Sequence, residues 1–329
     1  MGVVSETASS VRRGRPLRFA AALLVLLALI GYVVVQYVTG GGPPRCVVRT
    51  AEDGGSSYEL SAEQADNAAT ISAVGTTRGM PQRAVTIALA TALQESALRN
   101  IEHGDRDSLG LFQQRPSQGW GTPEQILDPV YAAGKFYDHL AEVPGYSRLP
   151  LTVAAQRVQR SGFPQAYAKH EPDATLLAAA LTGRAAATLT CESRDGGRAG
   201  DPAKLRSELV RAFGSDVLPR GGAGRGSPGA QDTTELAVPV PSTAEAERAG
   251  APRRGWELAH WAVARADTLR ISEVSYGGRV WSAAESGKGW RKEPAGAAGS
   301  GADESSGAGT SGDGTADQGT GDVRIRLAQ

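Results

Sequence analysis

Residues 88–121 have the sequence ALATALQESALRNIEHGDRDSLGLFQQRPSQGWG, in which a helical pattern ends at a polar loop. Residues 81–98 contain no internal Gly or Pro, and Pro81 favours a first helical turn. Glu95 lies near the end of this predicted helix, above a face of small, mostly apolar side chains. Such a face shields a carboxyl from water, which suits a general acid. We therefore predict a catalytic Glu95; the alternative is a solvent-facing residue at a helix end.

The segment after the predicted helix is rich in turn-forming and amide side chains. Residues 104–110 have the sequence GDRDSLG, whose Gly, Asp and Ser residues stop the helix. Side-chain amides can exchange hydrogen bonds with sugar hydroxyls, and an indole ring can stack on a sugar face. The pattern therefore predicts a carbohydrate groove, with a polar surface loop as the alternative. Its amide and indole groups belong to Gln113, Gln114, Gln118 and Trp120.

The motifs ALQESAL and SLGLFQQ resemble the Glu-Ser and Gly-Leu-Met-Gln signatures of the lytic transglycosylase and goose-type lysozyme superfamily, with Phe112 in place of Met. The string from residue 104 to 140 is similar to lysozyme-like domains of actinobacterial cell-wall and phage proteins. The resemblance covers residues 60–191 and implies an all-α lysozyme-like domain with Glu95 as the catalytic acid. It implies substrate-binding roles for Ser96, Gly110, Leu111 and Gln113, to which we add Gln114 and Trp120.

One family motif is absent. The sequence AAQRVQRSGFPQAY at 154–167 stands where the family has Tyr-Asn-Ala-Gly, so Gln159 and Tyr167 are the candidate groove residues there. Asp105 and Asp107 are candidates for a second carboxylate, which an inverting hydrolase needs about 6.5 to 9.5 Å from the first. The alternative is that these two aspartates fix the turn.

The resemblance implies a peptidoglycan-cleaving enzyme, either a lytic transglycosylase or a muramidase. It would cut the MurNAc-GlcNAc linkage with Glu95 as acid and base and without a cofactor. A different class of function stays open: a non-catalytic peptidoglycan-binding or scaffold protein. A transporter subunit is not expected, because one membrane span cannot enclose a polar path. Protein partners are not predicted.

Composition argues against two further classes of function. The formal net charge is +0, so there is no cationic surplus for nucleic-acid phosphates. The chain has 4 His, 2 Cys and 2 Met and no CxxC or HExxH pattern, so no metal site is expected.

The N-terminal residues predict a membrane anchor. Residues 1–18 carry four arginines and no acid after Glu6, as a cytoplasmic flank does. Residues 19–38 are predominantly apolar and cover about 30 Å as a helix, which predicts one transmembrane helix in contact with membrane lipid. The positive-inside rule then places the rest of the chain outside the cell. A cleaved signal peptide is the alternative.

Cys46 and Cys191 are the only cysteines in the chain and bracket the lysozyme-like domain predicted at 46–191. In an oxidising compartment they are expected to form a disulfide. Closing so long a loop would stabilise the fold by roughly 4 to 5 kcal/mol in the chain-entropy model. Two free thiols are the alternative.

The C-terminal part predicts a linker followed by a small α+β domain. Residues 192–252 are rich in Gly, Arg, Pro, Ala and Asp, with one possible helix at 202–213. Residues 253–329 predict a helix, two strands joined at Gly277 and Gly278, a disordered insertion at 294–321 and a last strand. This part resembles a small C-terminal domain of actinobacterial cell-wall proteins. Its last strand has Arg324 and Arg326 where a His-Asp-His pattern is expected, which indicates a degenerate copy.

Overall fold

The computed structural model describes residues 14–38, 44–52, 54–193, 198–218, 234–240, 250–293 and 321–329. The chain divides into two units, Met1–Pro43 and Pro44–Gln329. The predicted flank up to residue 13 and the predicted insertion up to residue 320 lie outside the described residues.

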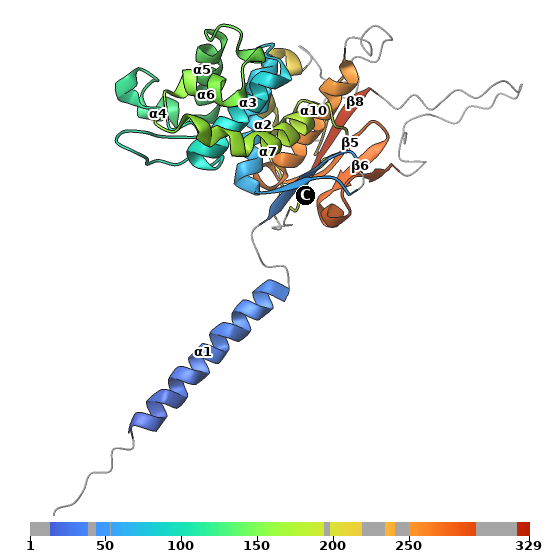
Figure 1. Cartoon of the computed structure of the whole chain (residues 1–329). Helices are drawn as coiled ribbons and strands as arrows, with labels where there is room; N and C mark the ends of the chain where they lie inside the picture. The colour runs from blue at the N-terminus through green and yellow to red at the C-terminus, as the bar shows by residue number, and fades with distance from the viewer. Residues whose placement is uncertain are drawn as a thin grey trace, which may run out of the picture. The chain divides into compact units, whose positions relative to one another are not determined.

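Helix α1 (Gly14–Val38) is the described helix of the first unit (Figure 1). A helix needs about 20 mostly apolar residues to cross roughly 30 Å of hydrocarbon. Within the described ranges, no helix combines enough length with enough apolar character to do so. The predicted transmembrane helix at 19–38 and the single-pass cell-membrane localisation are therefore wrong.

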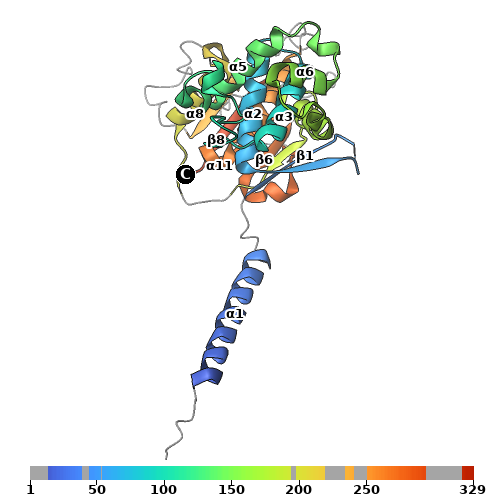
Figure 2. The same ribbon diagram turned by 60° about the vertical axis from the view of Figure 1, so that its left-hand side comes forward.

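Helix α3 (Gln82–Ser96) lies at the centre of the helical part of the second unit. Its side chains from Ala84 to Leu93 are buried, and it packs against α2, α5 and α7; Figure 2 shows α2 and α3 side by side. The surrounding elements are α2 (Ala62–Thr77), η1 (Pro116–Gln118), α4 (Pro123–Ile126), α5 (Pro129–Ala141), η2 (Tyr146–Arg148), α6 (Leu151–Gln159), η3 (Pro164–His170) and α7 (Glu171–Leu181).

A capping box forms the start of α2. The Ser61 hydroxyl accepts from the backbone N–H of Gln64 at 3.2 Å, and the Gln64 side chain accepts from the backbone N–H of Ser61 at 2.8 Å. These bonds satisfy two backbone donors that a helix start leaves open. They also fix Gln64 in reach of the end of α3, where it takes part in the site described below.

A three-stranded antiparallel sheet contradicts the all-α prediction for 46–191. Its order is β2-β1-β3, formed by β1 (Arg45–Arg49), β2 (Ser57–Ser61) and β3 (Leu189–Cys191). Alternation is a weak signal here because β3 has 3 residues and β1 only 5. Cys46 and Cys191 are direct cross-strand partners and form the predicted disulfide.

A second antiparallel sheet has five strands in the order β4-β8-β5-β6-β7. The predicted hairpin is confirmed: β5 and β6 meet at Gly277 and Gly278, whose φ values of 59° and 70° suit a tight hairpin turn. The predicted last strand is confirmed as β8. The strands are β4 (Glu235–Pro239), β5 (Ile271–Tyr276), β6 (Arg279–Ser282), β7 (Arg291–Lys292) and β8 (Asp322–Leu327), with η5 (Ala283–Lys288) after β6.

Helix α10 (Ala251–Ala264) joins this sheet to the helices around α3. It packs against α2 and α7 on one side and against β5 and β8 on the other (Figure 1). Gly183, which follows α7, lies directly against the start of α10. A Cβ on Gly183 would lie 1.8 Å from the carbonyl oxygen of Arg253. Near its middle, Nδ1 of the buried His260 lies 2.8 Å from the carbonyl oxygen of Ala180.

The segment predicted as a linker, 192–252, contains packed elements. The predicted helix at 202–213 is confirmed as α8 (Pro202–Phe213), which buries Leu205, Leu209 and Phe213 and is followed by η4 (Ser215–Val217). Strand β4 pairs with β8 along its whole length. Composition favours a linker because Gly, Ala and Arg dominate the segment, whereas a few apolar side chains are enough to dock it.

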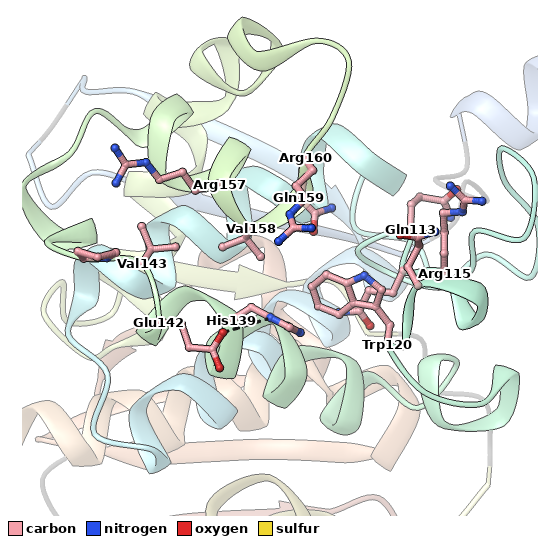
Figure 3. A pocket seen from close by; sticks show the side chains of 13 residues that line it. Gln113, Arg115, Trp120, His139, Glu142, Val143, Arg157, Val158, Gln159 and Arg160 are labelled. Carbon is pink, nitrogen blue, oxygen red and sulfur yellow. Dashed lines mark ion pairs between the residues drawn. The ribbon is translucent and has the colours of Figure 1, made fainter.

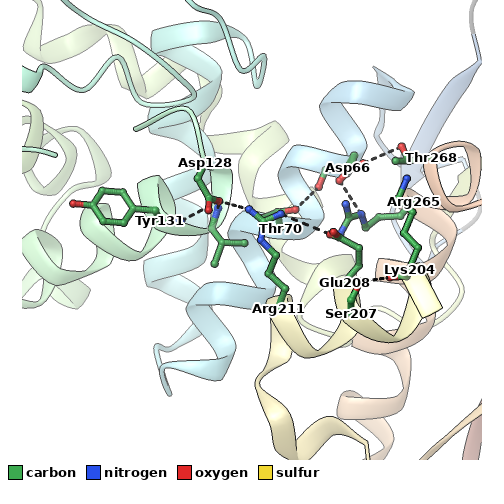
Figure 4. Close-up of polar contacts among 11 residues, drawn as sticks. Asp66, Thr70, Asp128, Tyr131, Lys204, Ser207, Glu208, Arg211, Arg265 and Thr268 are labelled. Carbon is green, nitrogen blue, oxygen red and sulfur yellow. Dashed lines mark hydrogen bonds and ion pairs between the residues drawn. The ribbon is translucent and has the colours of Figure 1, made fainter. Parts of the chain in front are cut away.

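An ion-pair cluster connects α2, α8 and the short helix α11 (Ala266–Leu269) (Figure 4). The Arg265 guanidinium lies 2.9 Å from the carboxylates of both Asp66 and Glu208. The Thr268 hydroxyl donates to Asp66 at 3.0 Å. Burial raises the pKa of Asp66 despite the neighbouring Arg265 cation. The cluster is thus a structural junction within the second unit.

Candidate functional site

Glu95 is half-buried in the last turn of α3 and meets a neutral hydroxyl group. The Tyr167 hydroxyl donates a hydrogen bond to Glu95 Oε1 at 2.7 Å. Burial, the nearby Glu95 charge and this hydrogen bond all raise the pKa of Tyr167. Tyr167 therefore stays protonated and keeps donating, which holds the Glu95 carboxyl in one orientation.

Ser96 ties the end of α3 to the glutamine-containing segment. Its buried hydroxyl lies 2.8 Å from the Leu111 carbonyl oxygen and 3.1 Å from that of Ala92 in its own helix. The single hydroxyl proton bridges the two acceptors. Ser96 thus positions the segment that follows Glu95.

The backbone reverses direction directly after Ser96. Ala97 and Leu98 adopt left-handed φ values of 54° and 59°, which cost roughly 1 to 2 kcal/mol for each non-glycine residue. Two side chains of α2 hold this turn: Gln64 donates to the Ala97 carbonyl and Asn67 to the Leu98 carbonyl, both at 2.8 Å. Non-glycine residues held in this conformation are concentrated at functional sites.

The segment 109–114 forms a tight hairpin against the end of α3. Leu109 and Gln114 exchange backbone hydrogen bonds at 2.9 and 3.0 Å. Gly110 has a φ of 75°, and a Cβ there would lie 2.7 Å from the Ile126 carbonyl oxygen, so the position requires glycine. Leu111 is fully buried and contributes to the core. Gln113 turns back, donating to the carbonyls of Gly110 and His103.

The two candidate second carboxylates occupy different environments. The Asp107 carboxylate accepts from Arg115 Nε at 2.8 Å and from the Ser117 backbone N–H at 2.9 Å. These hydrogen bonds hold the pKa of Asp107 far below its usual range. Asp105 is exposed, and its backbone carbonyl accepts from the Ser108 N–H at 3.0 Å. The contacts of Asp107 are those of a residue that fixes the loop.

A cavity of about 550 Å³ lies between the ends of α5 and α6 and the hairpin (Figure 3). We call it the α5–α6 cavity. Five predicted groove residues line it: Gln113, Gln114, Gln118, Trp120 and Gln159. The Trp120 ring packs at 4.3 Å from that of His139 on one side, and Gln159 lies on the other. Glu95 does not line this cavity, so the predicted residues form two adjoining groups.

The two groups are linked through consecutive carbonyls of the hairpin. Gln159 Nε2 donates to the Phe112 carbonyl at 2.8 Å, while Ser96 contacts that of Leu111. Phe112 itself is buried and stacks on Phe136 at 4.7 Å. The α5–α6 cavity therefore adjoins the Glu95 end of α3 through a segment that is anchored on both sides.

Sequence reasoning missed the charged residues of the cavity, which are Arg115, His139, Glu142, Arg157 and Arg160. Arg157 lies in the last turn of α6, and Arg160 follows the end of that helix with a left-handed φ of 50°. Two arginines so close in sequence could have suggested them. His139 lies in the last turn of α5, and Glu142 directly follows that helix.

Comparison with known proteins gives one match of limited extent. Residues 206–302 match the family model of the VldE C-terminal domain, which covers less than a third of the chain. The matched segment begins in α8 and includes α10 and the strands β4 to β7, but neither Glu95 nor the α5–α6 cavity. No curated protein matches the chain.

Proposed function

We propose that this protein cleaves the glycan strands of peptidoglycan, with Glu95 as the catalytic acid and base. The observation that carries the proposal is the arrangement at the end of α3. Glu95 is half-buried and oriented by Tyr167, and the next residue fixes the hairpin whose glutamine side chains line an adjoining cavity.

Glu95 would act in two proton transfers. The protonated carboxyl gives its proton to the glycosidic oxygen as the bond to the sugar breaks, and the resulting carboxylate then takes a proton from the nucleophile. The nucleophile is the C6 hydroxyl of the same sugar in a transglycosylase and water in a hydrolase. Because Tyr167 engages Oε1, Oε2 is the oxygen that faces the substrate in this proposal.

The state of Asp107 favours the single-carboxylate version of the reaction. A second carboxylate in an inverting hydrolase must be free to activate water. The carboxylate of Asp107 instead accepts hydrogen bonds from Arg115 and Ser117. We therefore favour a transglycosylase that forms 1,6-anhydro products.

Purified peptidoglycan sacculi provide the test of this proposal. The full chain should release glycan fragments, and mass spectrometry should show 1,6-anhydro ends. Glu95→Gln keeps the shape but removes the proton, so release should fall at least about 100-fold while binding to sacculi persists. If the wild-type chain releases nothing from several types of sacculi, the enzymatic proposal is wrong.

A non-catalytic peptidoglycan-binding protein is the second candidate. The observation that favours it is that the α5–α6 cavity, with its amide and indole groups, is not lined by Glu95. Such a protein would sediment with sacculi, and Glu95→Gln would leave every measured property unchanged.

A further inference from the structure

We propose that the α5–α6 cavity binds the acidic peptide substituent of a peptidoglycan strand while the adjacent sugar lies at Glu95. Arg157 and Arg160 receive the carboxylates of that peptide. The inference rests on the proposed function and adds the form of the substrate, a peptide-bearing strand in preference to a bare glycan.

The charge of the cavity is the first argument. Arg115 is paired with Asp107 at 2.8 Å, and His139 lies 3.7 Å from Glu142. Arg157 and Arg160 are exposed, and in the part of the chain that the structure describes neither has an acidic partner. Glu142 is the acid lining the opposite wall. The cavity therefore presents two guanidinium groups whose charge the fold leaves uncompensated, and guanidinium groups pair well with carboxylates.

Two buried amide oxygens are the second argument. Gln159 and Gln114 line the cavity, and each donates through Nε2 to a backbone carbonyl, that of Phe112 and that of Ala132. This use of the amino group fixes which end of each amide is oxygen. Both Oε1 atoms are buried and lack a hydrogen-bond donor among the described residues. A ligand rich in N–H groups would supply the missing donors.

The position of the cavity is the third argument. Its wall residue Gln159 contacts the Phe112 carbonyl, and Ser96, next to Glu95, contacts the Leu111 carbonyl. Figure 3 shows Arg160 beside Gln159, across from Trp120, with Arg157 farther along α6. A strand with one sugar at Glu95 can thus place a substituent of that sugar or its neighbour in the cavity. Carboxylates and peptide N–H groups occur together in the peptide substituent, whereas a strand stripped of its peptides lacks the peptide N–H groups and keeps only the lactyl carboxylate of each MurNAc.

The test measures binding by the full chain carrying Glu95→Gln, so that turnover does not interfere. The ligands are glycan strands with their peptides and the same strands after amidase removal of the peptides. Peptide-bearing strands should bind about 5- to 20-fold more tightly, the range expected for two partly exposed charge-assisted contacts. The preference should shrink as salt is raised, because exposed ion pairs are screened.

Two sets of variants assign the preference to the cavity. Arg157→Ala with Arg160→Ala should bring the affinity ratio close to one, while affinity for stripped strands, which keep only the lactyl carboxylate, should fall much less. Arg184→Ala removes the same charge from an exposed position that does not line the cavity and should leave the ratio intact. Glu142→Gln should raise the ratio, because it removes the opposing acid.

Equal affinity for the two forms of strand overturns the inference, even if the wild-type chain cleaves sacculi. An unchanged preference in the double arginine variant overturns it as well. Absence of cleavage together with an arginine-dependent preference supports the inference and rejects only the catalytic role of Glu95.

Discussion

Glu95 and Glu257 are both helical glutamates that contact a hydroxyl group, yet their surroundings differ. Glu95 lies at the end of α3, half-buried, with the neutral Tyr167 as its partner. Glu257 lies within α10, is 6% exposed, and contacts both the Thr76 hydroxyl and, at 2.9 Å, the Arg254 guanidinium. Burial raises the pKa of Glu257, and Arg254 opposes this effect. Burial alone therefore does not distinguish the two glutamates, whereas their hydrogen-bond partners do.

The same contrast extends to the neighbourhoods of the two residues. Around Glu95 the backbone is left-handed at two residues and side chains line an adjoining cavity. Around α10 the charged groups pair with one another, as in the Asp66, Arg265 and Glu208 cluster. We infer that the first region is arranged for binding and reaction and the second for holding the two sheets and the helices together.

The largest change in unfolding free energy is expected at the ion-pair cluster of Asp66, Arg265 and Glu208. Arg265→Ala leaves the carboxylates of Asp66 and Glu208 close together without their shared cation. Removing one partner of a buried ion pair costs about 3 to 5 kcal/mol of unfolding free energy. Arg45→Ala is the control, since its pair with Glu59 is 62% and 65% exposed and should contribute less than about 1 kcal/mol. Denaturant unfolding of both variants measures the difference; equal losses would show that the cluster has no special role.

The two glutamates should respond in opposite ways to the same substitution. Glu95→Gln should abolish most glycan release, a loss of at least about 2.7 kcal/mol of transition-state stabilisation, with little change in melting temperature. Glu257→Gln should lower the unfolding free energy by about 1 to 3 kcal/mol because the bond from Arg254 loses its charge. Activity per folded molecule should then persist. Loss of activity in folded Glu257→Gln protein would contradict the division of roles.

The pH dependence of the unfolding free energy should also differ between the ion-pair cluster at Asp66 and the loop at Asp107. The pKa of Asp66 is higher in the folded protein than in the unfolded chain. Asp66 therefore adds to the unfolding free energy at pH values below its pKa in the unfolded chain, and this gain is lost as the pH rises through its pKa in the folded protein. The pKa of Asp107 is lower in the folded protein than in the unfolded chain. Asp107 therefore adds to the unfolding free energy at pH values above its pKa in the unfolded chain, and this gain is lost on acidification. Relative to Asp66→Asn, the wild type should gain stability as the pH falls from 7 toward 4, by at most about 1.4 kcal/mol per pH unit.

The matching variant Asp107→Asn should show the opposite trend. Relative to it, the wild type should lose stability as the pH falls below the usual range of an aspartate. Urea unfolding at several pH values gives both differences. If the unfolding free energies of the two variants, each relative to the wild type, changed with pH in the same direction, the expected difference between Asp66 and Asp107 would be wrong.

Local sequence signals predicted the elements that depend on local chemistry. The helix ending near Glu95, the hairpin at Gly277 and Gly278 and the helix at 202–213 are all confirmed. The disulfide is confirmed as well. The two helix ends and the hairpin depend on residues whose hydrogen bonding or backbone preference is visible in a short window, whereas the disulfide followed from the presence of just 2 cysteines.

Long-range contacts could not be predicted in the same way. The first sheet forms because β3 returns to β1 across 145 residues, which no short pattern records. Gln64 and Asn67 support the turn after Glu95 from another helix. The charged lining of the α5–α6 cavity likewise depends on how α5 and α6 meet. Tyr167 was selected from the sequence, but its bond to Glu95 spans 72 residues and appears only in the fold.

The smallest effect concerns the backbone turn next to Glu95. Ala97 has a φ of 54°, which costs roughly 1 to 2 kcal/mol for a non-glycine residue and nothing for glycine. Glycine gives back about 0.5 to 1 kcal/mol through the entropy of the unfolded chain. Ala97→Gly should therefore raise the unfolding free energy by about 0.5 to 1 kcal/mol, seen as a higher denaturant midpoint at an unchanged m-value.

The same substitution within α10 should have the opposite sign. Ala259 is fully buried in regular helix, so Ala259→Gly loses helix propensity and a packed methyl group and should cost about 1 kcal/mol or more. A stabilised Ala97→Gly variant that still cleaves sacculi would show that the strain of alanine in the left-handed turn is a cost at the site and not a requirement of the reaction. Stabilisation accompanied by a large loss of cleavage would instead make the rigidity of Ala97 part of how Glu95 is positioned. A loss of stability at Ala97 would mean that its methyl group packs well enough to outweigh the strain, and the contrast with α10 would disappear at this residue.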